Sequence, residues 1–186
     1  GDMLVSGGSS ISSDTWSSGH AGSVTVSAKN LVVEQSGISS DSVGEGNAGS
    51  VNVAVAEMLA VVRGSISSDT WVDGNAGNLS VTAGSLLIDG QGSIAKISSE
   101  SFGTGKAGSV DINVTREMVM VDRGRVSSDS INSGVAGPAG DVSVTAGSLI
   151  IDGYGVPAYI SSDAVGVGNA GSVSINVSGA MALYNG

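Results

Sequence analysis

Acidic residues recur at one position of a repeated phrase, and they are the first residues of this sequence that could do chemistry. Carboxylate oxygens in a regular row could bind Ca²⁺, which takes oxygen ligands, or a pair of them could carry out acid–base hydrolysis. The simpler hypothesis is that each acid lies in a solvated turn and accepts hydrogen bonds from nearby backbone donors. We favour this structural function, keep Ca²⁺ as the alternative, and predict no other cofactor. Versions of Ile-Ser-Ser-Asp occur six times, and their acidic residues are Asp14, Asp41, Asp69, Glu100, Asp129 and Asp163.

A second recurring position lies two residues after each acid and is apolar in every copy. Exposed aromatic rings at such a position could stack on sugars, which makes Trp16, Trp71 and Phe102 candidate glycan contacts. The competing hypothesis is that the following glycine-rich loop folds over this column as a small satellite core. We favour the satellite core because half of the column is aliphatic. The column consists of Trp16, Val43, Trp71, Phe102, Ile131 and Val165.

Catalytic signatures are absent from the sequence. His20 is the only histidine, and it occupies a turn position where other copies carry Asn47, Asn75 or Lys106. No P-loop, zinc signature or dinucleotide fingerprint occurs. We therefore predict that the protein is not an enzyme and assign no catalytic residue, with a polysaccharide-cleaving enzyme on the same fold as the alternative.

The elements that position these residues repeat about every 30 residues, which indicates a repeat architecture. A Gly-x-Ala-Gly turn follows most copies; we expect its Ala at a tight corner and its last Gly in a positive-φ conformation. Segments such as Ser50–Ala54 then alternate polar and β-branched residues, as half-buried strands do. A second apolar strand such as Met58–Val62 follows, and the Ile-Ser-Ser piece makes the third.

Three short strands and three turns in each period predict one coil of a parallel β-helix. The fold class we expect is therefore all-β, a β-solenoid of about six coils, right-handed by the general preference for right-handed crossovers. Residues 1–186 would form one domain of about three double-coil repeats, with equivalent residues stacked in columns.

A longer period places Met3, Met58, Met118 and Met181 in alternate coils, so the sequence begins and ends at the same phase of the repeat. Terminal coils without caps would present unpaired strand edges that accept another chain. We therefore expect a segment of a longer array or a unit that stacks end to end. The candidate stacking residues are Met3, Leu4, Met181 and Leu183.

Charge and composition exclude several partners. The chain has 186 residues, a formal net charge of −10 and no cysteine. We predict no nucleic-acid partner, because phosphate binding needs clustered Lys and Arg. The sequence contains no apolar run long enough for a transmembrane helix, so we predict no membrane insertion.

The phrases Gly46-Asn-Ala-Gly-Ser-Val51 and Ala83-Gly-Ser-Leu-Leu-Ile-Asp-Gly90, together with Ile-Ser-Ser-Asp, resemble the repeats of filamentous-haemagglutinin-like exoproteins of bacterial two-partner secretion systems. This resemblance covers essentially the whole chain. It implies a right-handed parallel β-helix located outside the cell or at its surface. The function it implies is that of a structural and adhesive rod, whose partners would be neighbouring repeats, other copies, or host and matrix glycans. A carbohydrate-binding module on the same fold is the alternative.

Overall fold

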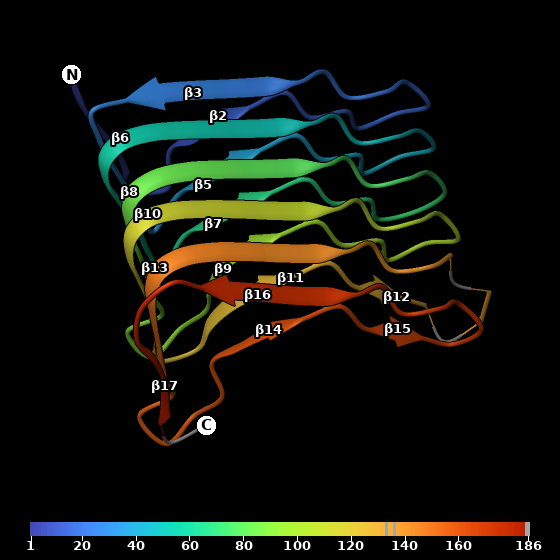
Figure 1. Ribbon diagram of the computed structural model, residues 1–186. Coiled ribbons are helices and arrows are strands. Elements are labelled where there is room, and N and C mark those ends of the chain that lie inside the picture. Colours follow the sequence, from blue (N-terminus) through green and yellow to red (C-terminus); the bar gives the residue numbers. More distant parts are fainter. Residues whose placement is uncertain (133, 136, 185–186) are drawn as a thin grey trace.

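The structure, a computed structural model, describes residues 1–132, 134–135 and 137–184, and over these residues the chain is a parallel β-solenoid of about six turns. The described ranges contain strands and turns but no helix, and so none that could span a membrane. Figure 1 shows the coils stacked one below another, with the N-terminus and C-terminus at opposite ends of the stack. Ile38 pairs with Ile11 on one side and with Ile66 on the other, which confirms that successive repeats lie directly on one another.

The largest sheet takes one or two strands from each coil, and all of its pairings are parallel. It turns a corner along its length, which Figure 1 shows as the bend at the left of the longest strands. Its strands are β1 (Asp2–Ser6), β3 (Val24–Ala28), β4 (Asn30–Glu34), β6 (Val51–Val62), β8 (Leu79–Asp89), β10 (Val110–Val121), β13 (Val142–Asp152), β16 (Val173–Val177) and β17 (Met181–Tyr184).

The repeated Ile-Ser-Ser segments build the second sheet, which closes the coil on its other side. Beyond it, each coil continues through one further bridge position, and in the last coils this position widens into the short pair β12 (Ser130–Ile131) and β15 (Ala164–Val165). The second sheet consists of β2 (Ser10–Ser12), β5 (Gly37–Ser39), β7 (Ser65–Ser67), β9 (Ala95–Ser98), β11 (Gly124–Ser127) and β14 (Tyr159–Ser161), and the third of β12 (Ser130–Ile131) and β15 (Ala164–Val165).

The two consecutive strands expected between the turns are one continuous strand in the central coils. The segments Ser50–Ala54 and Met58–Val62 both fall within β6 or at its edge. At the corner, β6 has one residue more than β8, because Val55 pairs with Ala83 whereas Met58 pairs with Ser85. An inserted residue of this kind is a β-bulge, which bends a strand without ending it. In the sequence, the alternation of polar and apolar residues is interrupted at this point. The sequence does not show that the strand continues through the interruption.

Inward-facing aliphatic side chains form the columns that hold the coils together. Leu31, Leu59, Leu86, Met118 and Leu149 stack in register, and each is at most 1% exposed. Met3 and Met181 continue this column at its two ends. The expected equivalence of Met58 with the other methionines is wrong. β6 and β10 have the same extra residue at the corner, but Met58 lies three residues after Val55 whereas Met118 lies four after Val114, so Leu59 takes the column position in β6.

The last glycine of the Gly-x-Ala-Gly turn is needed for close approach and not for a positive φ. Positive φ angles occur instead at the first glycine of two copies, Gly46 and Gly74. A Cβ added at Gly77 would lie 2.2 Å from the carbonyl oxygen of Gly49 in the preceding coil, and Gly108 has the same relation to Gly77. Stacked turns in successive coils therefore leave no room for a side chain at this position.

Candidate functional site

The outward side of the second sheet and of the bridge position that follows it carries most of the candidate residues. We call this surface the acidic–aromatic face. From one edge to the other it has a column of mixed residues that includes Lys96 and Arg125, a column of serines, the acidic column and the apolar column. The side chains of a strand point alternately inward and outward, so each outward column is formed by every second residue of the segment.

The acidic column is a ladder that joins each coil to the next. The Oδ1 atom of Asp41 accepts a hydrogen bond from the backbone N–H of Asp69 at 2.8 Å, and Oδ1 of Asp69 accepts one from Glu100 N–H at the same distance. Asp14 and Asp129 bond the next coil in the same way. Every acid of the column from Asp14 to Asp129 also accepts a bond from a serine hydroxyl of the next coil. Asp14, Asp41, Asp69 and Asp129 are backbone acceptors, but the predicted solvated turn with local donors is wrong: the donors belong to the neighbouring coil, and Asp69 and Asp129 are buried.

A buried serine ladder runs directly inside the acidic one. Ser99 Oγ donates to the Gly77 carbonyl at 2.8 Å and accepts from Gly108 N–H at 2.9 Å, so one hydroxyl joins two turns. Ser68 makes the same pair of bonds with Gly49 and Gly77. This function was not predicted from the sequence, although the presence of serine at this position in every Ile-Ser-Ser-Asp copy is a visible signal. The ladder explains why the Ile-Ser-Ser-Asp phrase and the Gly-x-Ala-Gly turn repeat together.

Burial of the acidic column raises the pKa of several carboxyls. Desolvation is the largest cause for Asp41 and for Asp129, opposed by hydrogen bonds from the backbone, and repulsion from the neighbouring acids raises these pKa values further. No group of three or more His, Cys, Asp or Glu residues in the described part of the chain is arranged to hold a metal ion. Calcium binding by Asp14, Asp41, Asp69, Glu100, Asp129 and Asp163 stays a prediction, and the hydrogen-bonded Oδ1 atoms of the ladder would have to be shared with it.

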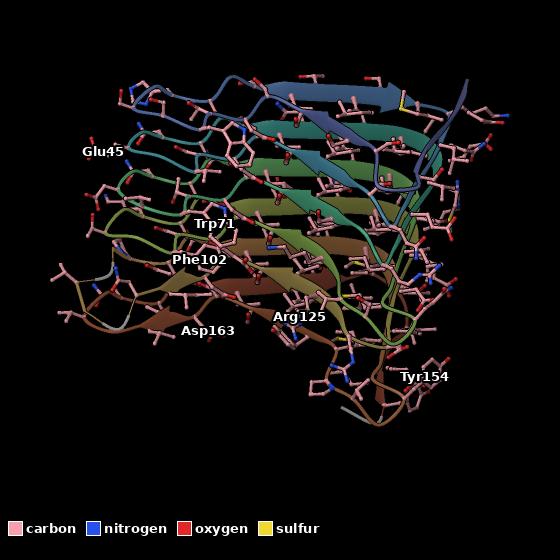
Figure 2. The ribbon with its side chains drawn as sticks, turned by 180° about the vertical axis from the view of Figure 1, so that it is seen from behind. Glu45, Trp71, Phe102, Arg125, Tyr154 and Asp163 are labelled. Carbon is pink, nitrogen blue, oxygen red and sulfur yellow. The ribbon has the colours of Figure 1, made fainter. Side chains whose placement is uncertain are left out.

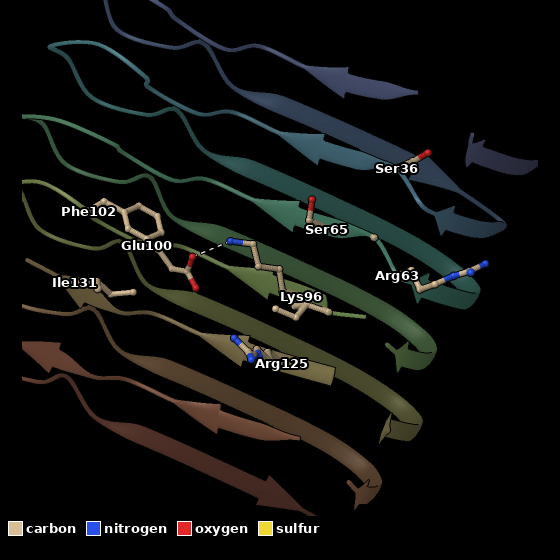
Figure 3. Close-up of a pocket in the computed structure, with 10 residues that line it drawn as sticks. Ser36, Arg63, Ser65, Lys96, Glu100, Phe102, Arg125 and Ile131 are labelled. Atoms are coloured by element: carbon tan, nitrogen blue, oxygen red, sulfur yellow. Dashed lines mark hydrogen bonds and ion pairs between the residues drawn. The ribbon is translucent and has the colours of Figure 1, made fainter. Parts of the chain in front are cut away.

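Lys96 forms an ion pair with two successive members of the acidic column. Its Nζ lies 2.7 Å from Oε2 of Glu100 in its own coil, the contact drawn in Figure 3. It also lies 3.0 Å from Oδ2 of Asp69 in the coil before. Burial lowers the pKa of this ammonium, but the two carboxylates outweigh that effect and bring it above its ordinary value. For Asp69, burial raises the pKa of the carboxyl against the opposing effect of Lys96. The sequence showed a lone lysine at this place, but not that it bridges two coils.

The apolar column lies on the surface, so the satellite core expected for it is wrong. Trp16 is 78% exposed and Trp71 is 54% exposed, and Ile131 and Val165 are also exposed. The glycine-rich loops stack on each other, turn carbonyl against turn glycine, and do not fold over the column. Trp71 and Phe102 stack face to face with ring centroids 4.7 Å apart, and Figure 2 shows them one above the other on this face.

Two hollows flank this stacked pair. The first, of about 390 Å³, is lined by Asp14, Trp16, Asp41, Val43 and Trp71. The second, of about 470 Å³, lies further along the face, and Lys96, Glu100, Phe102 and Arg125 are among the residues that line it. Arg125 lies over the ring of Tyr159 at 5.0 Å from its centroid. Glycan contact by Trp16, Trp71 and Phe102 stays a prediction, now with all three side chains at the surface or partly exposed.

His20 belongs to a ladder of turn side chains that joins successive coils. Its Nδ1 accepts the backbone N–H of Asn47 at 2.9 Å, and the Oδ1 of Asn47 accepts that of Asn75 at 2.8 Å. Asn75 in turn accepts from Lys106 N–H. A histidine acceptor thus replaces the asparagine acceptor of the other copies in a bond between coils.

The four candidate stacking residues occupy different positions. Met3, Met181 and Leu183 continue inward columns, since they pair with Leu31, Leu149 and Ile151. Met181 and Leu183 are 46% and 63% exposed, because no further coil covers them in this structure. Leu4 instead pairs with Val32 on the outward side of the sheet, so it belongs to the flank and not to the end surface.

Comparison of the chain with protein-family models, with curated proteins and with solved structures finds no match.

Proposed function

We propose that the protein is a stiff β-solenoid rod, a structural segment of an adhesin-like exoprotein located outside the cell or at its surface. The observation that carries this proposal is the ladder system between coils. Besides the parallel sheets, one acidic and one serine ladder join successive coils across the side of the stack. At about 4.8 Å per coil, six coils extend about 30 Å along the axis. A solenoid grows in length by adding coils that make only neighbour contacts, and each added coil brings its own ladder bonds.

Immunogold electron microscopy of intact source cells, with an antibody raised against this chain, tests the proposal. Label on fibres or rods that project from the cell surface, or on material in the medium, is the expected result. Label confined to the cell interior would contradict it. The same antibody applied to permeabilised cells controls for access to the interior.

The sharper form of the proposal is that open coil ends join parallel strands from another coil. The edges of β1 at one end and of β16 and β17 at the other are unpaired in this structure, and each could accept a coil of a longer chain or of a second copy. Sedimentation velocity over a hundredfold concentration range tests self-association. We expect rods that lengthen with concentration, and Leu183→Lys should abolish this growth because it puts a charge on the inward column. Leu4→Lys, on the flank, is the matched control and should leave the growth unchanged.

A polysaccharide-cleaving enzyme is the alternative class. Acid–base hydrolysis needs two carboxylates that can exchange protons with the substrate. The Oδ1 atoms of Asp14, Asp41, Asp69 and Asp129 each accept two hydrogen bonds between coils, which favours the structural function. Release of short oligosaccharides from a polyuronide by the wild type, and its loss in Asp41→Asn, would overturn our proposal.

A further inference from the structure

The ion pair of Lys96 shows what two successive acids of the ladder bind when a cation is within reach. Lys96 belongs to a column of the second sheet in which one residue per coil points over the acids, and its register partners are Ser65 and Arg125. Its ammonium lies between the acid of its own coil and the acid of the coil before. Phe102 lines the same hollow. The unit is therefore an ammonium group held by two carboxylates beside an aromatic ring.

The first hollow repeats this unit without the cation. Asp14 and Asp41 are successive acids of the ladder, and the residue that corresponds to Lys96 in the coil of Asp41 is Gly37. No ion pair involving Asp14 or Asp41 is present in the described residues. Oδ1 of Asp14 accepts two ladder bonds, whereas its Oδ2 accepts no hydrogen bond from the residues that the structure describes. One oxygen of this carboxylate is thus held in place while the other is available to a ligand.

Aromatic walls enclose the same hollow. Trp16 and Trp71 lie two coils apart, about 10 Å by strand spacing, and the smaller Val43 lies between them. One face of the Trp71 indole is covered by Phe102, so the opposite face is the one available toward Val43. Tryptophan is the strongest of the aromatic side chains in binding a cation over its ring. Carboxylates and indoles together attract an organic cation, whereas a neutral sugar would leave the negative charge of Asp14 and Asp41 unpaired.

We propose that the hollow formed by Asp14, Trp16, Asp41, Val43 and Trp71 binds a primary alkylammonium group supplied from outside the chain. The ammonium donates hydrogen bonds to the two carboxylates, as Lys96 does to Asp69 and Glu100, and the alkyl stem packs over Val43 between the indoles. A lysine side chain of another protein and a free alkylamine share this chemistry.

Tryptophan fluorescence reports on this hollow directly, because the two tryptophans of the chain are the two that line it. The wild type is titrated with n-butylammonium chloride and, separately, with Nα-acetyl-lysinamide, against sodium chloride at equal ionic strength. We expect a saturable change with the amines and none with sodium. Tetramethylammonium, which cannot donate a hydrogen bond, should bind at least fivefold more weakly than butylammonium. A preference for acetyl-lysinamide would indicate a protein-borne lysine as the natural source, and a preference for butylammonium a free amine.

Gly37→Lys is the decisive variant, because it supplies the missing cation in cis. A Cβ at Gly37 would lie 3.4 Å from Ser65 Oγ, which is ordinary contact, and the position has no positive φ. This variant should lose at least tenfold in amine affinity. Asp14→Asn combined with Asp41→Asn should lose as much while keeping the ladder acceptors, and it decides the matter if Gly37→Lys does not fold. Asp111→Asn, on the exposed side of β10, is the matched control and should bind as the wild type does.

Three results would overturn the proposal. The first is the absence of a saturable fluorescence change with either amine. The second is equal amine affinity in the wild type and in the doubly substituted Asn variant. The third is tighter binding of a neutral oligosaccharide such as maltotriose than of butylammonium, which would assign the hollow to sugars.

Discussion

Replacing Lys96 by methionine should destabilise the protein by an amount that the ion-pair geometry sets. Methionine keeps most of the length and apolar volume of the side chain and removes its charge. The Asp69 side chain is only 5% exposed and that of Glu100 only 13%, and their carboxylates lie 3.0 and 2.7 Å from the ammonium. Without Lys96, two acids in adjacent coils would face each other at low solvent exposure with no cation between them.

The magnitude follows from the burial of the pair. Removing one partner of a fully buried ion pair costs about 3–5 kcal/mol, because the remaining charge is left desolvated. The Lys96 side chain is 26% exposed, so solvent screens part of the interaction, and we expect a loss of about 2–3 kcal/mol. With an m-value of about 2–3 kcal/mol per molar urea, the unfolding midpoint should fall by roughly 1 M.

Urea unfolding followed by circular dichroism measures this loss, and a double-mutant cycle with Asp69→Asn tests its cause. Asparagine keeps an oxygen that can accept the Glu100 N–H, which Asp69 bonds at 2.8 Å, but it carries no charge. The double variant should therefore recover most of the stability lost in Lys96→Met. Lys29→Met is the matched control: it breaks a pair with Glu57 in which both side chains are more than half exposed, and should cost about 0.5 kcal/mol or less. Equal effects of Lys96→Met and Lys29→Met, or no recovery in the double variant, would refute this account of Lys96.

Three further predictions concern the ladders and the turns. Burial raises the pKa of Asp41, Asp69 and Asp129 in the folded state, so above pH 3.8 the unfolded chain binds fewer protons than the folded one. Stability should therefore fall as the pH rises, and the urea midpoint should be higher at pH 4.5 than at pH 7.5. Ser99→Ala should cost about 1–3 kcal/mol because it leaves the partly buried Gly77 carbonyl and the buried Gly108 N–H unpaired, whereas the exposed Ser109→Ala should leave the midpoint unchanged. Gly77→Ala should cost about 2–3 kcal/mol by forcing a Cβ against the Gly49 carbonyl. Gly37→Ala, whose Cβ would meet Ser65 only at ordinary contact distance, should leave the thermal midpoint unchanged or slightly raised.

The stacking of the coils could be predicted from the sequence because it depends on spacing alone. Ile11, Ile38 and Ile66 occur at a near-constant interval. An interval of this length, with alternating polar and apolar residues between, predicts coils that stack in register. The bend inside β6 could not be predicted, because the alternation of polar and apolar residues is interrupted in the same way where a strand ends and where it has a β-bulge. The placement of Met58 is wrong for a different reason: the methionine of β6 lies one residue nearer the corner than Met118 of β10, so Leu59 and not Met58 is equivalent to Met118.

The exposure of the apolar column could not be predicted because sequence pattern does not show where a loop goes. Six apolar residues at one position are compatible with a covered core and with an exposed stripe. The deciding contacts are between the turns themselves: Gly49, Gly77 and Gly108 lie against carbonyls of the preceding coil, which keeps the loops stacked beside the column and not over it. The covered core and the exposed stripe differ only in how the turn backbones pack on each other, and the side-chain pattern of the sequence does not show that packing.

Comparison among the coils separates the residues that build the rod from those that could give its surface a specificity. The buried serine of the inner ladder is the same in every copy, and the acid of the outer ladder is always Asp or Glu, because both are fixed by bonds to the next coil. The two outermost columns of the face, the mixed column and the apolar column, are not bound in this way, and they vary: the position of Lys96 holds Ser10, Gly37, Ser65, Arg125 or Tyr159 in other coils. The face therefore changes along the axis, from open acids beside exposed indoles near the N-terminus to acids paired with or flanked by cations further on. A rod whose coils are uniform inside and different outside can bind different partners at different points along its length.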